Sequence, residues 1–251
     1  MNKFKRRIAN RSTELNSNLV FALDISRPLY SLPKSEREEK RTAVYEEAFS
    51  ILQGVEEHIA AVKVNYPLLL TLGPDRTSDL LDQFGILAIA DFKVADIDNT
   101  CKWIGRQALE MGFDAIIAHP FVGYEKGLSG LFQATREQGG GIILVINMSH
   151  PGSKQFITPN AKKLAEFAVD NGADGVVAPA TRPEEVSRAR TWVGEELLLF
   201  TPGVGAQGGK PGDAVSAGAD YEIVGRAIYQ ADRPAESAER LKKQIGKASL
   251  G

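Results

Sequence analysis

The sequence predicts a single closed (β/α)8 barrel, and three observations lead to this prediction. Eight short apolar runs alternate with segments of helical periodicity along 251 residues, a length typical of such barrels. The runs are almost continuously apolar, as parallel strands covered on both faces are. Polar and charged residues gather where several runs end, which is where barrel active sites lie. An open doubly wound sheet is the alternative, but its Gly-x-Gly-x-x-Gly fingerprint is missing after the first run.

The first half of the chain supplies four strands and four helices. The expected strands are Leu19–Asp24, Ala60–Asn65, the run that ends at Asp91 to Lys93, and Ala115–Pro120. The expected helices are Ser35–Glu57, Arg76–Phe84, Asp98–Met111 and Glu125–Gln138. In Ser35–Glu57 apolar residues recur at helical spacing and the charges lie largely on the other face, which is typical of a surface helix. The connection between Arg27 and Lys34 is long, and no motif in it indicates a role.

The second half repeats the alternation. The expected strands are Ile142–Asn147, Gly175–Pro179, Leu197–Thr201 and Tyr221–Gly225. The expected helices are Ala161–Asp170, Glu184–Trp192, a short helix after a glycine-rich loop, and Ala235–Lys247. No linker or low-complexity tract interrupts the pattern, so we expect residues 1–251 to form one domain with residues 1–17 as an N-terminal arm.

The overall composition is that of an ordinary globular protein, with 43% hydrophobic and 25% charged residues. A net charge of −2 gives no reason to expect nucleic acid or an anionic membrane as partner. The single cysteine, Cys101, excludes an internal disulfide and a cysteine-based metal cluster, and it fits a reducing cytoplasm. The basic segment from Lys3 to Arg11 lacks the apolar core of a signal peptide, so we expect a solvated arm; a transit peptide is the alternative.

The most informative stretch places three ionisable residues at the end of a buried strand: Asp91, Lys93 and, just beyond, Asp96. Side chains two residues apart on a strand point to the same face, so Asp91 and Lys93 should lie together. Asp24 and Lys63 sit on the two preceding strands, which predicts an array of alternating charge at one rim. A structural ion pair is the simple interpretation. An ammonium held between carboxylates can also protonate a carbanion, and a fixed carboxylate can repel a substrate carboxylate.

Two glycine-rich segments after the last two strands predict a phosphate site. Glycines at 203, 205, 208 and 209 allow the backbone to approach an anion, and Gly225 with Arg226 adds amides and a guanidinium. A flexible turn with a surface arginine is the alternative. No metal-binding motif accompanies these residues, and we expect His119 and His150 to make structural hydrogen bonds rather than to bind metal.

With these residues in place, the chain resembles the orotidine 5′-phosphate decarboxylase family, especially its short microbial and archaeal type. The resemblance covers nearly the whole barrel. It rests on four motifs in order, Asp91–Ile97, Met148–Gly152, Pro202–Gly209 and Val224–Tyr229.

The resemblance implies decarboxylation of orotidine 5′-monophosphate to uridine 5′-monophosphate and CO₂, the last step of de novo UMP synthesis, without cofactor or metal. Lys93 matches the proton donor to C6 of the pyrimidine, and Asp91 matches the carboxylate beside the leaving group. Lys63 and Asp96 match the other members of the charged tetrad.

The same resemblance assigns the binding residues and the assembly. Asp24 matches the contact to the ribose, Ser149 that to the base, and Ile97 with Pro202 would line the pyrimidine pocket. The residues expected around the phosphate are Gly203, Gln207, Gly225 and Arg226. The resemblance also implies a homodimer, in which Asp96 and Thr100 reach the neighbouring subunit's site, in the cytoplasm and without nucleic-acid or membrane partners.

Two alternatives belong to other classes. The first is a magnesium-dependent sister enzyme acting on a phosphosugar; such relatives place a metal-binding glutamate at the end of the second strand, where this chain has Lys63. The second is a non-catalytic nucleotide-binding barrel, which would gain nothing from carboxylates that face an anion.

Overall fold

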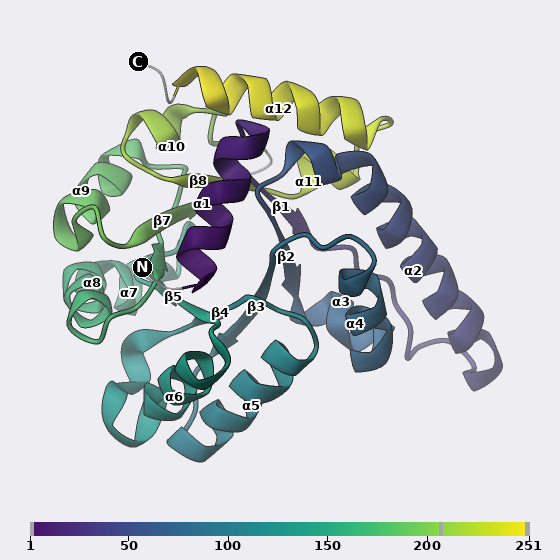
Figure 1. Ribbon diagram of the computed structural model, residues 1–251, viewed down its shortest axis with the longest axis horizontal. Coiled ribbons are helices and arrows are strands. Elements are labelled where there is room, and N and C mark those ends of the chain that lie inside the picture. Colours follow the sequence, from purple (N-terminus) through teal and green to yellow (C-terminus); the bar gives the residue numbers. More distant parts are fainter. Residues whose placement is uncertain (1–2, 206–207, 249–251) are drawn as a thin grey trace.

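The computed structural model describes residues 3–205 and 208–248, and its centre is a closed barrel of eight parallel strands (Figure 1). Each strand pairs with its neighbours in the sequence, and β8 closes on β1 through the register Leu19–Glu222 to Phe21–Val224. The strands are β1 Leu19–Leu23, β2 Ala61–Asn65, β3 Ala88–Val94, β4 Ala115–Ala118, β5 Gly141–Val145, β6 Gly175–Val177, β7 Leu198–Pro202 and β8 Tyr221–Val224. The predicted barrel is therefore confirmed.

Helices surround the barrel and follow the strands in alternation (Figure 1). They are α1 Lys3–Leu15, α2 Lys34–Val55, α3 Tyr66–Leu72, α4 Pro74–Asp82, α5 Asp98–Glu110, α6 Ser129–Gln138, α7 Ser153–Phe156, α8 Ala161–Asp170, α9 Pro183–Val193, α10 Asp213–Ser216, α11 Arg226–Tyr229 and α12 Pro234–Ala248. Across the described ranges, none of these helices is both long and apolar enough to cross a membrane.

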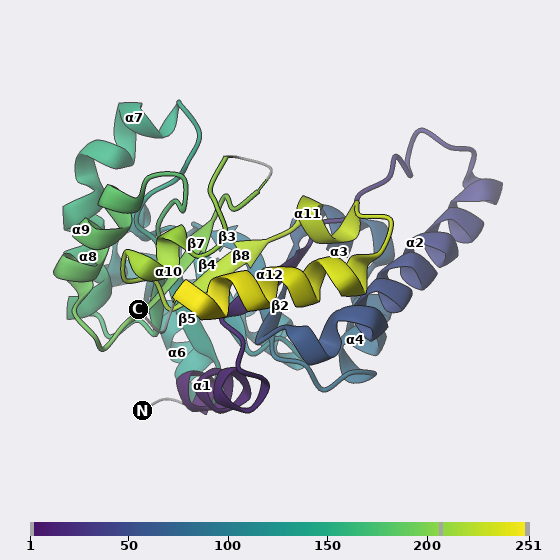
Figure 2. The same ribbon diagram turned by 90° about the horizontal axis from the view of Figure 1, so that it is seen from above.

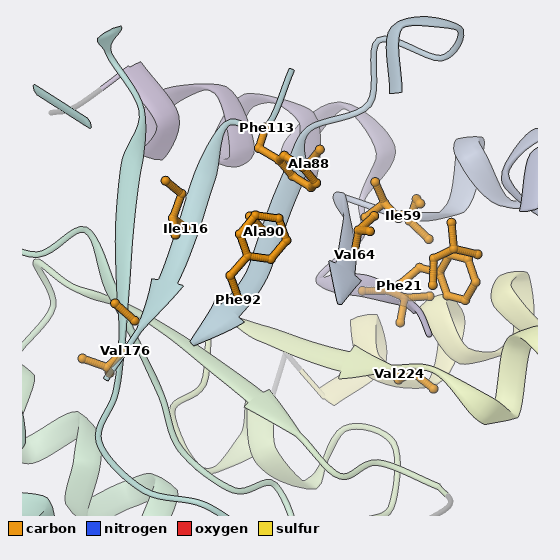
Figure 3. Packing of buried hydrophobic residues seen from close by; sticks show 14 of the residues in the cluster. Phe21, Ile59, Val64, Ala88, Ala90, Phe92, Phe113, Ile116, Val176 and Val224 are labelled. Carbon is orange, nitrogen blue, oxygen red and sulfur yellow. The ribbon is translucent and has the colours of Figure 1, made fainter. Parts of the chain in front are cut away.

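Apolar side chains form two layers of core, one inside the barrel and one between the strands and the helices. On β3, Ala88, Ala90, Phe92 and Val94 belong to the outer layer, whereas Ile89 belongs to the inner one. Figure 3 shows this outer layer, in which the ring of Phe92 lies edge-on to that of Phe113 with 5.4 Å between their centroids. The alternation leaves Asp91 and Lys93 on the inner face, toward the barrel axis.

The N-terminal segment corrects one expectation, because it is a packed helix and not a solvated arm. Phe4 and Ile8 of α1 are fully buried and join the inner core. The basic residues fasten the helix: Lys5 and Arg11 donate hydrogen bonds to backbone carbonyls, and Arg7 pairs with Asp114. Helix α1 thus covers the end of the barrel at which the strands begin, opposite the β7–α10 loop (Figure 2).

Other elements also differ from the expectation, among them the short helices α7 and α11, which were not predicted. Helix α3 was not predicted, since Tyr66–Leu72 is a nearly uniform apolar stretch without helical periodicity; it begins where the Asn65 side chain accepts a hydrogen bond from the Leu68 N–H at 3.1 Å. The helix expected over Glu125–Gln138 starts as an α-helix only at Ser129. Before it, the backbone turns with Lys126 at φ 55°, in the left-handed region.

Candidate active site

A cavity of about 290 Å³ opens at the carboxyl ends of the strands. Its floor is apolar and consists of inward-facing side chains of the inner core, namely Ala22, Ile117, Val145, Val177 and Ile223. Nine of the residues predicted for the site line the cavity: Asp24, Lys63, Asp91, Lys93, Ser149, Pro202, Gly203, Gly225 and Arg226. Apolar strands therefore carry a polar rim, as expected from the sequence.

Four charged side chains, one just after β1 and the others on β2 and β3, form a continuous chain of ion pairs in this cavity. The Lys63 Nζ donates to Asp91 Oδ2 at 2.7 Å and to Asp24 Oδ1 at 3.1 Å. The Lys93 Nζ donates to the other oxygen, Asp91 Oδ1, at 2.5 Å. Asp91 thus binds one ammonium on each carboxylate oxygen, and the expected alternation of charge is present within one chain.

The burial of this array is compensated by its own charges. Burial disfavours the ionised form of Asp91, yet the ammonium groups of Lys63 and Lys93 outweigh it and hold the Asp91 pKa below its ordinary value. Burial likewise disfavours the charged form of Lys63, but Asp91 and Asp24 raise the Lys63 pKa above its ordinary value. The central pair is therefore ionised at neutral pH, despite lying out of contact with most of the solvent.

Lys93 has an unusual backbone conformation. Its φ is 49°, in the left-handed region that non-glycine residues seldom adopt. The pairing of β3 with β4 shifts register between Ala90 and Val94, so this conformation belongs to a bulge at the end of the strand. Such a bulge re-aims a side chain, at a cost of roughly 1–2 kcal/mol for the left-handed residue. The ammonium of Lys93 is only partly exposed and points to Asp91.

The loop after β7 turns tightly, and its first residues, Gly203 and Val204, line the cavity. Gly203 and Gly205 have φ values of 116° and 76°, which only glycine adopts readily. The Gly205 N–H donates to the Gly209 carbonyl at 2.7 Å, and the Gly209 N–H donates to the Gly203 carbonyl at 3.1 Å. Gln207, which we predicted as a phosphate ligand, lies outside the described residues.

Gly225 and Arg226 complete this side of the cavity. A Cβ at Gly225 would lie 3.2 Å from the Ala22 carbonyl oxygen, so a side chain here would crowd β1. Arg226 begins α11 with its side chain exposed at the cavity. A guanidinium, a helix start and a glycine turn together offer the donors that a phosphate monoester accepts.

Three predicted residues do not join this cavity. Asp96, Ile97 and Thr100 lie on the β3–α5 connection and at the start of α5, and none of them lines the cavity of the single chain. The Asp96 Oδ1 accepts the Ile97 N–H at 2.7 Å, and the Ile97 side chain is 66% exposed. Their position at the surface leaves them available to another chain.

Several residues around the cavity were not predicted from the sequence. Tyr229, Asn147 and Met148 also line it. The signal for Tyr229 was its position three residues after Arg226, which places both side chains on one side of a helix. Burial lowers the pKa of His119, and the nearby ammonium of Lys93 lowers it further. Within the described ranges, no cluster of three or more His, Cys, Asp or Glu side chains is arranged to hold a metal ion.

Comparison with known proteins gives one consistent answer. A family model described as orotidine 5′-phosphate decarboxylase / HUMPS family matches residues 17–241. The orotidine 5′-phosphate decarboxylase of Pyrococcus abyssi is 46% identical over 80% of this chain and 95% of its own length. That of Methanosarcina mazei is 42% identical over 92% of this chain and 96% of its own length.

A solved structure agrees with these relatives. The crystal structure of orotidine 5′-monophosphate decarboxylase from Methanocaldococcus jannaschii, complexed with inhibitor BMP, superimposes with a TM-score of 0.79 at 36% identity. The similarity covers 91% of this chain and 98% of that one. The fold and the sequence therefore indicate the same relationship over nearly the full barrel.

Proposed function

We propose a function from a premise that the comparisons establish: the chain belongs to the orotidine 5′-phosphate decarboxylase / HUMPS family. In this proposal it converts orotidine 5′-monophosphate to uridine 5′-monophosphate and CO₂ in pyrimidine biosynthesis. The observation that carries the proposal is the pairing of Lys93 and Lys63 with the two oxygens of Asp91 inside the cavity. In the proposal, the Lys93 ammonium gives its proton to the carbanion. Lys63 occupies the position on β2 at which the magnesium-dependent sister enzymes have a metal-binding glutamate.

The proposed reaction uses the array directly. The bond between C6 of the pyrimidine and its carboxylate breaks, CO₂ leaves, and the electron pair stays on C6. Lys93 gives a proton to C6 and is later reprotonated from solvent, so the overall reaction consumes one proton. A fixed ammonium stabilises the developing carbanion without reorganisation of solvent, and we assign it the larger share of the rate enhancement. Repulsion between Asp91 and the leaving carboxylate is the smaller contribution.

The shape of the cavity fits the rest of this substrate. The charge array and the loop carrying Gly203 lie at different parts of one rim, so base and phosphate can be held together. In the proposal Asp24 binds the ribose, Ser149 and Pro202 contact the base, and Arg226 binds the phosphate. Gly203 and Gly225 supply backbone donors, with Gln207 as a further phosphate ligand. Binding energy from the remote phosphate can then be directed to the chemical step.

The proposed assembly is a homodimer with shared sites. Asp96, Ile97 and Thr100 of one chain would complete the partner's cavity, since they lie at the surface and outside their own cavity. The exposed side chains of Trp103 and Phe121 offer apolar surface on neighbouring elements. The same proposal places the enzyme in a reducing cytoplasm, in keeping with one buried thiol at Cys101.

The decisive experiment follows orotidine monophosphate absorbance after addition of the purified protein, with and without a chelator. We expect conversion to uridine monophosphate at the same rate in both. Loss of activity with the chelator, restored by Mg²⁺, would contradict the metal-free mechanism. Absence of any conversion by folded protein, together with turnover of a phosphosugar in the presence of Mg²⁺, would instead support the sister activity.

A further inference from the structure

Behind the cavity, one carboxylate joins two elements that belong to different parts of the barrel. Glu185 lies in the first turn of α9, does not line the cavity, and its side chain is 16% exposed. Its Oε1 accepts from the Arg182 guanidinium at 2.6 Å, and its Oε2 accepts from Asn147 Nδ2 at 2.5 Å. Asn147 lies two residues beyond the end of β5, so Glu185 ties the start of α9 to the loop after β5.

The two residues that bind Glu185 also form hydrogen bonds with the backbone of Met148, one with its N–H and one with its carbonyl. Asn147 Oδ1 accepts the Met148 N–H at 2.9 Å, and Arg182 donates to the Met148 carbonyl at 2.8 Å. Asn147 Oδ1 also accepts from the Thr158 hydroxyl at 2.9 Å, which fixes the orientation of the amide. Both peptide units of Met148 are therefore constrained. The second of them leads directly into Ser149, which lines the cavity.

The chemistry of these contacts requires a carboxylate at position 185. Both neighbours, the Arg182 guanidinium and the Asn147 Nδ2 group, are donors, and an ionised carboxylate offers an acceptor to each. A glutamine would turn its own NH₂ toward one of them and lose that bond. Because the contacts are mostly buried, the partner left without an acceptor would move to find one.

We propose that Glu185 is a positioning residue for recognition of the pyrimidine base. It acts through Asn147 and Arg182 on the Met148–Ser149 peptide and so sets where Ser149 meets the base. This inference rests on the proposed function, since it assumes that Ser149 contacts the base. It adds a residue that touches neither the substrate nor the cavity, and it assigns no role in phosphate binding.

The test separates base recognition from phosphate binding. Calorimetry would compare the affinities of wild type and Glu185→Gln for uridine monophosphate and for ribose 5-phosphate, which lacks the base. We expect the uridine monophosphate affinity to fall about tenfold, as for loss of one charge-assisted hydrogen bond, while the ribose 5-phosphate affinity stays unchanged. Glu184→Gln is the matched control, because Glu184 is the adjacent, exposed residue of the same turn, and both affinities should be retained.

Other outcomes would overturn the inference. Equal losses of affinity for the two ligands would mean that Glu185 supports the whole barrel rather than recognition of the base. No loss of affinity for either ligand would mean that the loop after β5 keeps its conformation without Glu185. If Glu185→Gln does not fold, Thr158→Val takes its place, since it removes another hydrogen bond to Asn147 without a change of charge. It should likewise weaken binding of uridine monophosphate and leave that of ribose 5-phosphate unchanged. A wild-type protein that fails to decarboxylate orotidine monophosphate would refute the proposed function instead, independently of the variants.

Discussion

At the scale of single residues, Asp91 fixes the positions of the two lysines beside it. It binds an ammonium on each oxygen, so that both lysines are oriented by one carboxylate. Lys63 has a second partner in Asp24, whereas Asp91 is the one ion-pair partner of Lys93 in the described part of the chain. Lys63 is therefore the buried, doubly held cation, and Lys93 is the more exposed cation that can approach a substrate. The proposed roles of the two lysines follow from this difference.

Replacement of Lys93 tests the proposed proton donor. Lys93→Ala should lower the decarboxylation rate by at least about a thousandfold, since it removes both the proton and the fixed charge. Uridine monophosphate should still bind, because Lys63 keeps Asp91 paired at 2.7 Å. Stopped assays of orotidine monophosphate consumption and calorimetry with the product measure the two effects. Lys102→Ala, a change on the outer surface, is the control, and near-normal turnover by Lys93→Ala would remove the residue from the chemistry.

Replacement of Asp91 tests the electrostatic balance through stability. The folded-state pKa of Asp91 lies below its ordinary 3.8, so the carboxylate stabilises the fold above that pH and the contribution is lost as the pH falls through the folded-state pKa. The Lys63 pKa is raised, so that its contribution is present below 10.5 and is lost only as the pH rises through its folded-state value. Both contributions are therefore present at neutral pH.

Asp91→Asn should accordingly lower the free energy of unfolding by about 3 kcal/mol at neutral pH, because it leaves a buried ammonium with a weakened set of partners. The difference from wild type should narrow as the pH falls below 3.8, because the unfolded wild-type chain then binds a proton that folding must remove from Asp91. Urea unfolding of both proteins over a series of pH values measures it. A difference that stays constant with pH would show that packing, not charge, explains the loss.

At the scale of elements, strands were easier to predict than irregular segments. Each strand is a compact apolar run, and its burial on both faces makes that run readable without any knowledge of its neighbours. That Asp91 and Lys93 share one face of β3 followed from the strand period alone. The left-handed φ of Lys93 could not be predicted, since it arises from the shifted pairing of β3 with β4. The hydrogen bond from Arg182 to the Met148 carbonyl was equally hidden, because the two residues are distant in sequence.

The N-terminal helix shows a different limit. The basic residues of α1 indicated a solvated segment, yet they bind backbone carbonyls and Asp114 while Phe4 and Ile8 enter the barrel. Two apolar residues four apart are a weak signal in so short a segment, and the surface they cover exists only once the barrel has closed. Phe4 packs so closely on β5 that a Cβ at Gly141 would lie 2.5 Å from its ring.

The position of α1 predicts that a substitution in this helix can lower stability and leave activity unchanged. Phe4→Ala should lower the free energy of unfolding by about 3–5 kcal/mol, as expected for a fully buried aromatic side chain. The rate per folded molecule should be unchanged, because α1 and the cavity lie at opposite ends of the barrel (Figure 2). Chemical denaturation and active-site titration measure the two quantities. Arg6→Ala, at an exposed position of the same helix, should change neither; a loss of specific activity in Phe4→Ala would link the two ends.

At the scale of the whole molecule, the single chain has a nearly complete site with exposed apolar residues nearby. Ile97, Trp103 and Phe121 are each more than half exposed. They lie on the β3–α5 connection, on α5 and after β4, which are neighbouring parts of the barrel (Figure 1). Large apolar side chains gathered in one region are typical of an interface between proteins. The extent of the domain over residues 1–251 and the homodimer remain predictions.

Mixed dimers test the shared site directly. Lys93→Ala and Asp96→Asn should each be nearly inactive alone. In a dimer of one chain of each kind, a site with partner-supplied Asp96 combines the intact Lys93 of one chain with the intact Asp96 of the other. The second site carries both substitutions.

Co-expression with random pairing makes about half of the dimers mixed, each with one intact site of two, so activity should reach about a quarter of the wild-type value. Differently tagged chains allow the mixed dimer to be purified and its absorbance assay compared with both parents. If Asp96 instead serves its own chain, every site in the mixture carries a substitution, and no activity should return. The recovery thus depends on which chain supplies Asp96, and loss of stability in either variant cannot imitate it.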